Sequence, residues 1–195
     1  MAQPPNYPPP PQTPAPPKKS NTVLWVVIIL GVGALCLFVM AIGAAILFPV
    51  FSQARFAAQK TACLSSVKQT SVALIMYSAE NDDRYPAAAA WMDKSEKYGG
   101  GNFSCPAVKK DVGPQAYGFG FNDALSGKAF TVVKSPESTV SVFESADTSK
   151  NAHGGEGEVV TPGRHGGSNR GNNFGYADSH AKFVPDGTAT HGWKP

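Results

Sequence analysis

The stretch ILFPVFSQARFAAQKTACLSSVKQ, residues 46–69, decides the fold expected for this chain. Its first residues end a long uncharged apolar run, and its last residues have the spacing of a helix that packs on one face. No linker separates the two patterns, and Pro49 lies where they meet. The sequence therefore predicts one long helix with a kink at Pro49, because proline removes one backbone hydrogen bond.

The apolar run, residues 23–48, contains no charge, and the nearest charges are Lys19 and Arg55. At ~1.5 Å per residue a helix of this length reaches roughly 39 Å, more than the ~30 Å hydrocarbon core of a bilayer. A cleaved signal peptide is the alternative, but its apolar region is shorter, at ~7–15 residues. We expect a transmembrane helix over residues 21–49.

An amphipathic continuation of this helix is expected over residues 50–79. Polar residues fill the other faces of this segment, and its apolar positions recur at spacings of three, four and seven. The apolar positions are Phe56, Cys63, Leu64, Val67, Leu74 and Ile75. The sequence Asn81-Asp82-Asp83, followed by Pro86, stops the helix after Ser78.

The residues before the apolar run, 1–20, are rich in proline and predict a solvated, polyproline-like tail. A flexible spacer and a docking motif for an aromatic groove both remain open for this tail. The net charge of the chain is +3 and its basic residues are scattered, which argues against nucleic acid as a partner.

The remainder, residues 80–195, predicts a loop-rich domain with a short helix within residues 87–98. Gly- and Asn-rich connections separate four short strand candidates, Ala129–Val133, Thr139–Phe143, Asn173–Tyr176 and Ala181–Val184. The aromatic and glycine residues of 117–122 are interpreted as packing and turn residues. One long helix and several short strands indicate an α+β fold in which the helix packs on a small antiparallel sheet.

Several motifs resemble those of one protein family. The run AAILFPVFSQAR and the following TACLSSVKQTSVALIMYSAENDDRYP are similar to the N-terminal helix of bacterial type IV pilin-like proteins. FSCPAV, KSPESTVSVFESA and GRHGGSNRGNNFGYADSHAKFV resemble, in the same order, motifs of G-like type II secretion pseudopilins that carry a C-terminal processing-associated domain. The resemblance covers roughly residues 41–184 and implies a pilin-like fold.

The chain departs from this family at the cleavage site of prepilins. Their Gly-Phe pair falls here on Val27-Ile28, and the glutamate that follows falls on Val32. In pilus-like filaments that glutamate is thought to neutralise the N-terminal amine of a neighbouring subunit. We therefore expect no processing by a prepilin peptidase.

The closing motif also differs from that of the family, since twelve residues rather than nine separate His165 from Asp178, and Ser179 replaces glycine.

The chain has three cysteines. Cys36 lies in the apolar run and is most simply a small apolar residue. Cys63 and Cys105 both lie beyond the run, and in oxidising surroundings a disulfide between them would tie the helix to the first loop. Two reduced structural thiols are the alternative.

The residues His165, Asp178 and His180 are close in sequence. Asp178 and Ser179 are residue types that favour a hairpin turn, and such a turn would place His180 beside Asp178. A hydrogen-bonded structural turn is the favoured interpretation. A metal site with Glu144 or Asp147 as a further ligand, and a catalytic role, are the alternatives.

No motif indicates an enzyme or a cofactor. The sequence has no G-x-S-x-G, no H-E-x-x-H and no phosphate-binding loop. We therefore expect no cofactor, and a structural metal ion is the alternative. The resemblance implies calcium as one such ion, because secretion pseudopilins can carry a C-terminal calcium site. Asn81, Asp82 and Asp83 lack the alternate spacing of a calcium loop.

The charges that flank the apolar run do not decide its orientation. Lys18 and Lys19 precede it, and Arg55, Lys60 and Lys68 follow it within about 20 residues, within the span over which the positive-inside rule applies. The cysteine pair and the resemblance both favour a cytoplasmic N-terminus and an extracytoplasmic domain in a single-pass cell-membrane protein.

Three functions are compatible with these features. The first is a pseudopilin-like structural or assembly role in a secretion or surface-appendage system, with pilin-like subunits or secretion components as partners. The second is a diverged stand-alone extracytoplasmic binding module that does not enter filaments and contacts cell-wall or surface polymers. The third, and least favoured, is a membrane-bound metallo-hydrolase that uses His165, Asp178 and His180.

Overall fold

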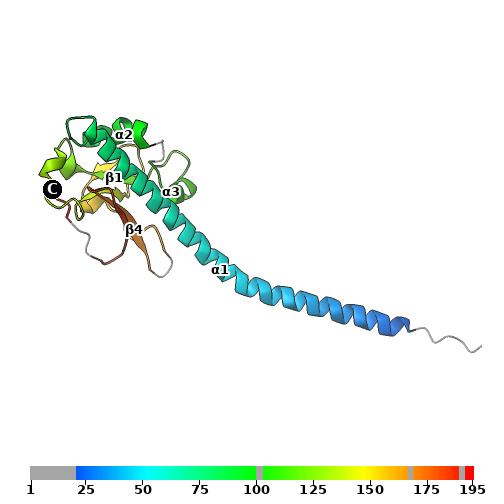
Figure 1. Ribbon diagram of the computed structural model, residues 1–195. Coiled ribbons are helices and arrows are strands. Elements are labelled where there is room, and N and C mark those ends of the chain that lie inside the picture. Colours follow the sequence, from blue (N-terminus) through cyan, green and yellow to red (C-terminus); the bar gives the residue numbers. More distant parts are fainter. Residues whose placement is uncertain (1–20, 100–102, 167–168, 189–191) are drawn as a thin grey trace, which may run out of the picture. The chain divides into compact units, whose positions relative to one another are not determined.

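The computed structural model describes residues 21–99, 103–166, 169–188 and 192–195, so the predicted Pro-rich tail lies outside the described residues. The longest element is helix α1, Thr22–Ala79, which contains the apolar run, Pro49 and the amphipathic segment (Figure 1). The long N-terminal helix expected from the sequence is therefore present. The chain divides into two compact units, Met1–Phe48 and Pro49–Pro195.

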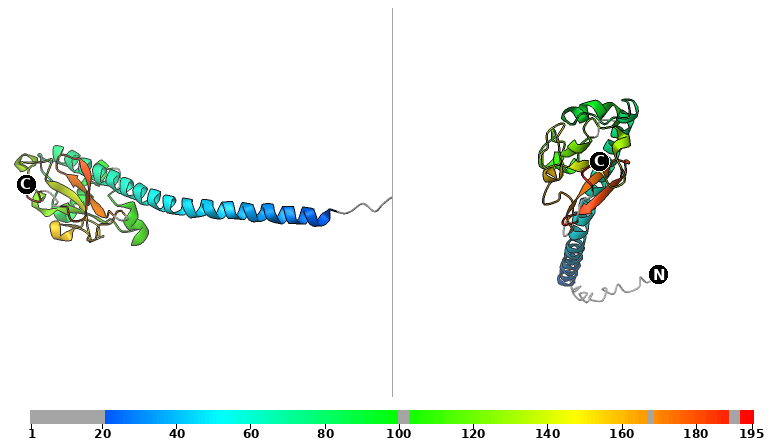
Figure 2. Two further views of the ribbon diagram at one scale, coloured as in Figure 1. Left: turned by 90° about the horizontal axis from the view of Figure 1, so that it is seen from below. Right: turned by 90° about the vertical axis from the view of Figure 1, so that its left-hand side faces the viewer.

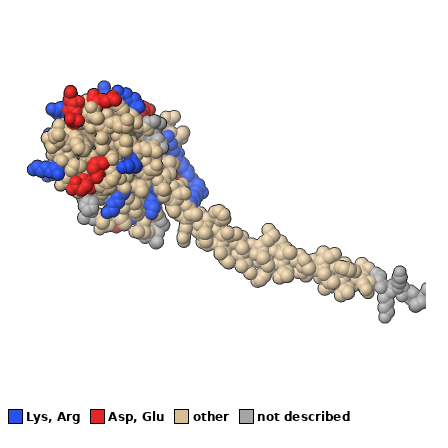
Figure 3. All heavy atoms as spheres, in the orientation of Figure 1, with Lys and Arg blue, Asp and Glu red and all other residues tan. Residues whose placement is uncertain are grey.

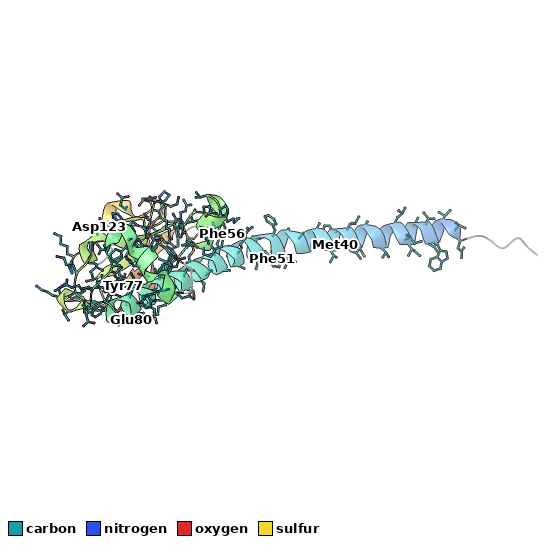
Figure 4. All side chains as sticks on the ribbon, turned by 90° about the horizontal axis from the view of Figure 1, so that it is seen from above. Met40, Phe51, Phe56, Tyr77, Glu80 and Asp123 are labelled. Atoms are coloured by element: carbon teal, nitrogen blue, oxygen red, sulfur yellow. A yellow bond between two sulfur atoms is a disulfide. The ribbon has the colours of Figure 1, made fainter. Side chains whose placement is uncertain are left out.

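The first unit contains the apolar part of α1. Its large apolar side chains are exposed, by between 44% (Ile28) and 80% (Phe48), and Figure 4 labels one of them, Met40, which is 70% exposed. Among the helices of the described residues, α1 alone is long and apolar enough to cross a membrane. By length and composition, α1 is a candidate membrane anchor.

In the second unit, one face of α1 is buried. The buried positions recur at spacings of three and four, and they are Cys63, Ser66, Val67, Thr70, Ser71, Ala73, Leu74 and Ser78. Half of them are small polar residues. The hydroxyls of Ser66 and Thr70 donate hydrogen bonds to carbonyl groups four residues earlier, at 3.1 and 2.8 Å, so both donors are satisfied inside the helix. Phe56, which the pattern assigns to the apolar face, is 50% exposed.

Among the described residues, two α-helices, four short 3-10 helices and five strands complete this unit. The 3-10 helix η1, Ala88–Ala90, leads directly into α2, Trp91–Gly99, within the segment where a short helix is expected. Helix α3, Pro106–Asp111, begins with a proline at its first position, where a backbone N–H has no partner in the helix. The strands are β1 (Phe119–Asn122), β2 (Val140–Glu144), β3 (His153–Gly154), β4 (Gly171–Tyr176) and β5 (Ala181–Pro185).

The five strands form one sheet in the order β3-β1-β2-β4-β5. Figure 2 shows strands of this sheet beside the part of α1 that belongs to the second unit. The α+β class is confirmed, but the expected purely antiparallel sheet is wrong, because β3 pairs with β1 in parallel. Strand β3 has only two residues, His153 and Gly154, and is too short to leave a period of two in the sequence. The sheet is therefore mixed.

Two local expectations also differ from the structure. The strand candidate Ala129–Val133 forms the 3-10 helix η3, Phe130–Val132, at the end of a loop that is held to Asp83 by a backbone hydrogen bond from Phe130. Residues 117–122, interpreted as turn and packing residues, include β1, whose four residues are all buried. Their alternating glycines conceal the strand, because glycine is unfavourable in strands in general.

The buried apolar residues form two clusters, one on each face of the sheet. The larger one joins α1 and α2 to the sheet, and Trp91 stacks on Phe121 at 5.8 Å between ring centroids. The smaller one includes Phe143 and Phe174, and Trp193 covers both rings at 5.2 and 6.5 Å in edge-on contacts. The near-terminal tryptophan therefore closes the face of the sheet opposite α1.

Helix α1 approaches β4 closely at Gly175. A Cβ atom at this position would lie 2.1 Å from Ser71 Oγ and 3.0 Å from Val67 Cγ1, both on α1. Real Cβ atoms do not approach other atoms so closely, so an alanine here would push the helix away from the sheet. The small residues on the buried face of α1 therefore serve to bring helix and strand together.

We predict that Gly175→Ala lowers the free energy of unfolding by about 1–3 kcal/mol, the range for an overpacked core. Gly155→Ala is the matched control, because a Cβ there meets no atom within 4 Å and the φ angle of −131° suits alanine. Urea unfolding of the full chain in detergent, followed by tryptophan fluorescence, to which buried Trp91 contributes, measures both variants. Equal unfolding free energies for the two variants would contradict this helix–sheet contact.

Candidate functional site

Four buried side chains with metal- or proton-binding atoms meet inside the second unit. Cys63 comes from α1, Cys105 from the residue before α3, Glu144 from the end of β2, and His165 from the loop before β4. The two cysteines and Glu144 are fully buried, and His165 is 3% exposed. We call these four residues the buried cluster.

The two cysteines are joined by a disulfide. The Cα atoms of Cys63 and Cys105 are 4.8 Å apart, and the bond spans 42 positions of the sequence. The disulfide links α1 to the start of α3, as the sequence interpretation favoured. Cys36, in the apolar part of α1, is free and exposed.

Glu144 and His165 form a buried pair. His165 Nε2 lies 2.7 Å from Glu144 Oε1, and Asn173 of β4 donates a second hydrogen bond to the same oxygen at 3.1 Å. The other carboxylate oxygen, Oε2, is buried and has no hydrogen-bond partner among the described residues. A buried acid with one unsatisfied oxygen is costly, which marks this position as one that deserves a functional explanation.

Backbone pairing and one arginine hold the loop that carries His165. The N–H and C=O of His165 bond to the C=O and N–H of Gly171, at 3.0 and 2.9 Å. The guanidinium of Arg164 donates hydrogen bonds to the carbonyls of Gly118 and Ser145, at 3.1 and 2.9 Å. Burial lowers the pKa of Arg164, and the negative charge of nearby Glu144 opposes that shift.

The arrangement differs from an acid–base relay. Cys105 Sγ lies 3.6 Å from His165 Nε2, the same nitrogen that faces Glu144. In a nucleophile–histidine–acid triad the acid binds the opposite ring nitrogen, so that the histidine connects the two groups. Here all groups converge on one point, and the four donor atoms of the cluster lie within 4.8 Å of one another. Convergence of this kind suits shared binding of one small species.

A cavity of about 430 Å³ leads to the cluster, since His165 forms part of its wall. Its other lining residues include Phe56 of α1 and the basic side chains of Lys110, Arg164 and Arg170. Figure 3 shows basic and acidic side chains spread over the surface of this unit, whereas the apolar part of α1 carries neither. The cavity reaches His165, and the lysine and arginine side chains in its lining are accompanied by the acid Asp111.

No protein-family model, curated protein or solved structure matches this chain. We therefore infer its function from the candidate membrane anchor, the domain packed on α1 and the buried cluster.

Asp178 and His180 meet at a hairpin turn, as the favoured interpretation predicts, whereas His165, the third residue of the alternative metal group, lies in the buried cluster. His180 Nδ1 lies 2.6 Å from Asp178 Oδ1, and its ring stacks on Tyr176 at 4.2 Å, in an exposed pair at the β4–β5 turn. Among the described residues, the one group of three or more suitable ligands is the buried cluster, which contains neither Asp178 nor His180. The hairpin turn is present, with Ser179 in the left-handed region at a φ of 75°.

The other metal candidates have local partners. Asp147 accepts hydrogen bonds from the backbone and hydroxyl of Ser149, at 2.8 and 2.9 Å, in a turn outside the cluster. Glu144, named in the sequence interpretation as a further ligand, does meet His165. Asn173 and Arg164 were not identified from the sequence, since neither belongs to a ligand motif. Only the pairing of β2 with β4 brings Asn173 beside Glu144.

Proposed function

We propose that this chain is a single-pass membrane protein with a pilin-like extracytoplasmic domain, and that it has a structural or assembly role in a secretion or surface-appendage system. The observation that supports the proposal is α1. One part of this helix is uncharged and exposed, and another part supplies a wall of a folded domain. Exposed apolar surface of this extent is typical of a segment covered by lipid or by other helices.

The disulfide supports the proposed orientation. Disulfides persist in oxidising compartments and are rare in the cytosol, so the domain that contains Cys63 and Cys105 would lie outside the cytoplasm. Residues 1–20 would then lie in the cytoplasm. The chain is thus expected to cross the cell membrane once, through the apolar part of α1.

We predict that a cysteine introduced at exposed Lys134 reacts with a membrane-impermeant maleimide on intact cells. The substitution is made in a Cys36→Ser background, so that no other free cysteine competes. The matched variant carries Asn6→Cys in the tail and should react only after the cells are permeabilised. The reverse pattern would contradict the proposed orientation.

A stand-alone binding module is the second candidate function. It is favoured by the absence of any carboxylate between Lys19 and Arg55, since the filament contact of pilin-like proteins is thought to need an acid in this segment. In the cavity lining Lys110, Arg164 and Arg170 outnumber the one acid, Asp111, and this balance would suit an anionic surface polymer. In this case the apolar part of α1 would act only as an anchor.

The free Cys36 distinguishes these two functions, because it lies in the segment through which pilin-like subunits would contact one another. For the assembly role we predict that a thiol-reactive cross-linker applied to native membranes yields dimers or heteromers through Cys36. Cys36→Ser is the control and should abolish these products. Monomers alone, without any co-purifying pilin-like or secretion component, would contradict the assembly role and favour the binding module.

A further inference from the structure

The geometry of the buried cluster points to a function that is independent of the membrane role. Two sulfur atoms, one imidazole nitrogen and one carboxylate oxygen lie within 4.8 Å of one another. They come from four different segments of the chain, so the fold rather than local sequence brings them together. Sulfur, nitrogen and oxygen ligands in a set of four are the combination that zinc sites in proteins use.

We propose that reduction of the Cys63–Cys105 disulfide converts the buried cluster into a site for one zinc-type divalent cation. The ligands are the thiolates of Cys63 and Cys105, Nε2 of His165 and a carboxylate oxygen of Glu144. The oxidised chain holds the disulfide and binds no cation at this point. The cluster is thus a site with two exclusive states, one cross-linked by sulfur and one by metal.

The conversion balances with a dithiol as reductant. The dithiol is oxidised to its own disulfide while the Cys63–Cys105 bond is broken, and both electrons and both protons pass to the two cysteine sulfurs. The cation then displaces one proton from each thiol to solvent, because only thiolates are good ligands. The metal itself changes no oxidation state.

The four ligand atoms need to move only slightly from their observed positions to surround one zinc ion. A tetrahedral zinc site with bonds of about 2.0–2.3 Å places its ligand atoms about 3.3–3.8 Å apart. His165 Nε2 is already 3.6 Å from Cys105 Sγ and 2.7 Å from Glu144 Oε1. The main change is that the two sulfur atoms, freed from their bond, separate to about 3.8 Å, the value for two thiolates on one zinc ion.

The surroundings also suit a bound cation. Within the part of the chain that the structure describes, the buried Oε2 of Glu144 has no hydrogen-bond partner, and Asn173 already binds Oε1 as an outer-shell group would. Two thiolates and one carboxylate carry three negative charges, which a divalent cation and the nearby guanidinium of Arg164 balance. The cavity that reaches His165 carries Asp111 beside its basic residues and provides the entry path.

Cobalt(II) is a suitable probe, since it occupies zinc sites and reports thiolate ligands by absorption. The full chain with Cys36→Ser is reduced with a dithiol in detergent and without oxygen. The dithiol is then removed, and the reduced chain is titrated with cobalt(II). We expect one equivalent of cobalt, with thiolate-to-metal charge-transfer bands and the visible bands of tetrahedral coordination. The oxidised chain should show neither. Absence of binding by the reduced chain, or equal binding by the oxidised chain, would overturn the proposal.

Variants separate the four-ligand site from a simple pair of thiols. His165→Ala and Glu144→Gln should each lower the affinity of the reduced chain for cobalt by at least about tenfold, the lower bound seen even for outer-shell partners. His180→Ala is the matched control, because its exposed histidine pairs with Asp178 away from the cluster. Equal affinities in all three variants would show adventitious binding by two thiols and overturn the proposal.

A measurement without a cluster substitution covers the case in which these variants fail to fold. X-ray absorption of zinc on the reduced chain should show two sulfur and two nitrogen or oxygen neighbours, with the scattering signature of one imidazole. A spectrum without sulfur or without imidazole would overturn the proposal.

Discussion

Replacing both Cys63 and Cys105 by alanine should lower the free energy of unfolding of the second unit by about 4 kcal/mol. The disulfide closes a loop of 42 positions, and a cross-link of that length restricts the unfolded chain by about this amount in the chain-entropy model. For a unit of this size the loss corresponds to a decrease in melting temperature of roughly 8–16 °C. Calorimetry of the full chain in detergent measures the change.

Cys36→Ser is the matched control for this variant, because Cys36 is free and lies in the apolar part of α1. It should leave the melting temperature of the second unit unchanged. If the double alanine variant had the same melting temperature as the unsubstituted chain, the disulfide would not constrain this unit.

His165→Ala should destabilise the second unit by about 3–5 kcal/mol, the range for removing one partner of a buried pair. The substitution leaves Glu144 fully buried with a single hydrogen bond, from Asn173. Removal of the imidazole also leaves a void beside the disulfide, since Cys105 Sγ contacts the ring. Urea unfolding, followed by tryptophan fluorescence, gives the difference.

A double variant isolates the role of the buried acid. His165→Ala combined with Glu144→Gln should be less destabilised than the sum of the two single variants, because the amide carries no charge that needs a partner. His180→Ala, in the exposed pair with Asp178, should change stability by less than about 1 kcal/mol. Additive losses in the double variant would contradict a coupled Glu144–His165 pair.

The sequence predicts most of the fold through periodicity. An uncharged run and a stripe at helical spacing predict α1, and short runs between Gly- and Asn-rich connections predict strands that the structure places as β2, β4 and β5. Strand β1 escapes prediction because its Gly120 and the preceding Gly118 are typical of turns, and β3 because it has only two residues. Periodicity also understates the buried face of α1, where serine and threonine replace large apolar residues to allow close contact with Gly175.

The site was harder to predict than the fold. Sequence proximity suggested His165 with Asp178 and His180, but the β4–β5 turn keeps the last two exposed. His165 instead meets Glu144, which lies 21 positions earlier, because strand pairing and the His165–Gly171 bridge fold the intervening loop back. Such contacts depend on strand register, which a single sequence does not reveal.

Hydrogen exchange of the full chain in lipid nanodiscs tests the central claim most directly, namely that α1 serves as a membrane anchor and as a wall of the domain. We predict slow exchange for the amides of residues 25–48, covered by lipid, and for those of residues 63–78, packed on the sheet. The turns around Arg55, exposed to solvent, should exchange faster. Rapid exchange throughout residues 63–78, or in the apolar part, would contradict the account.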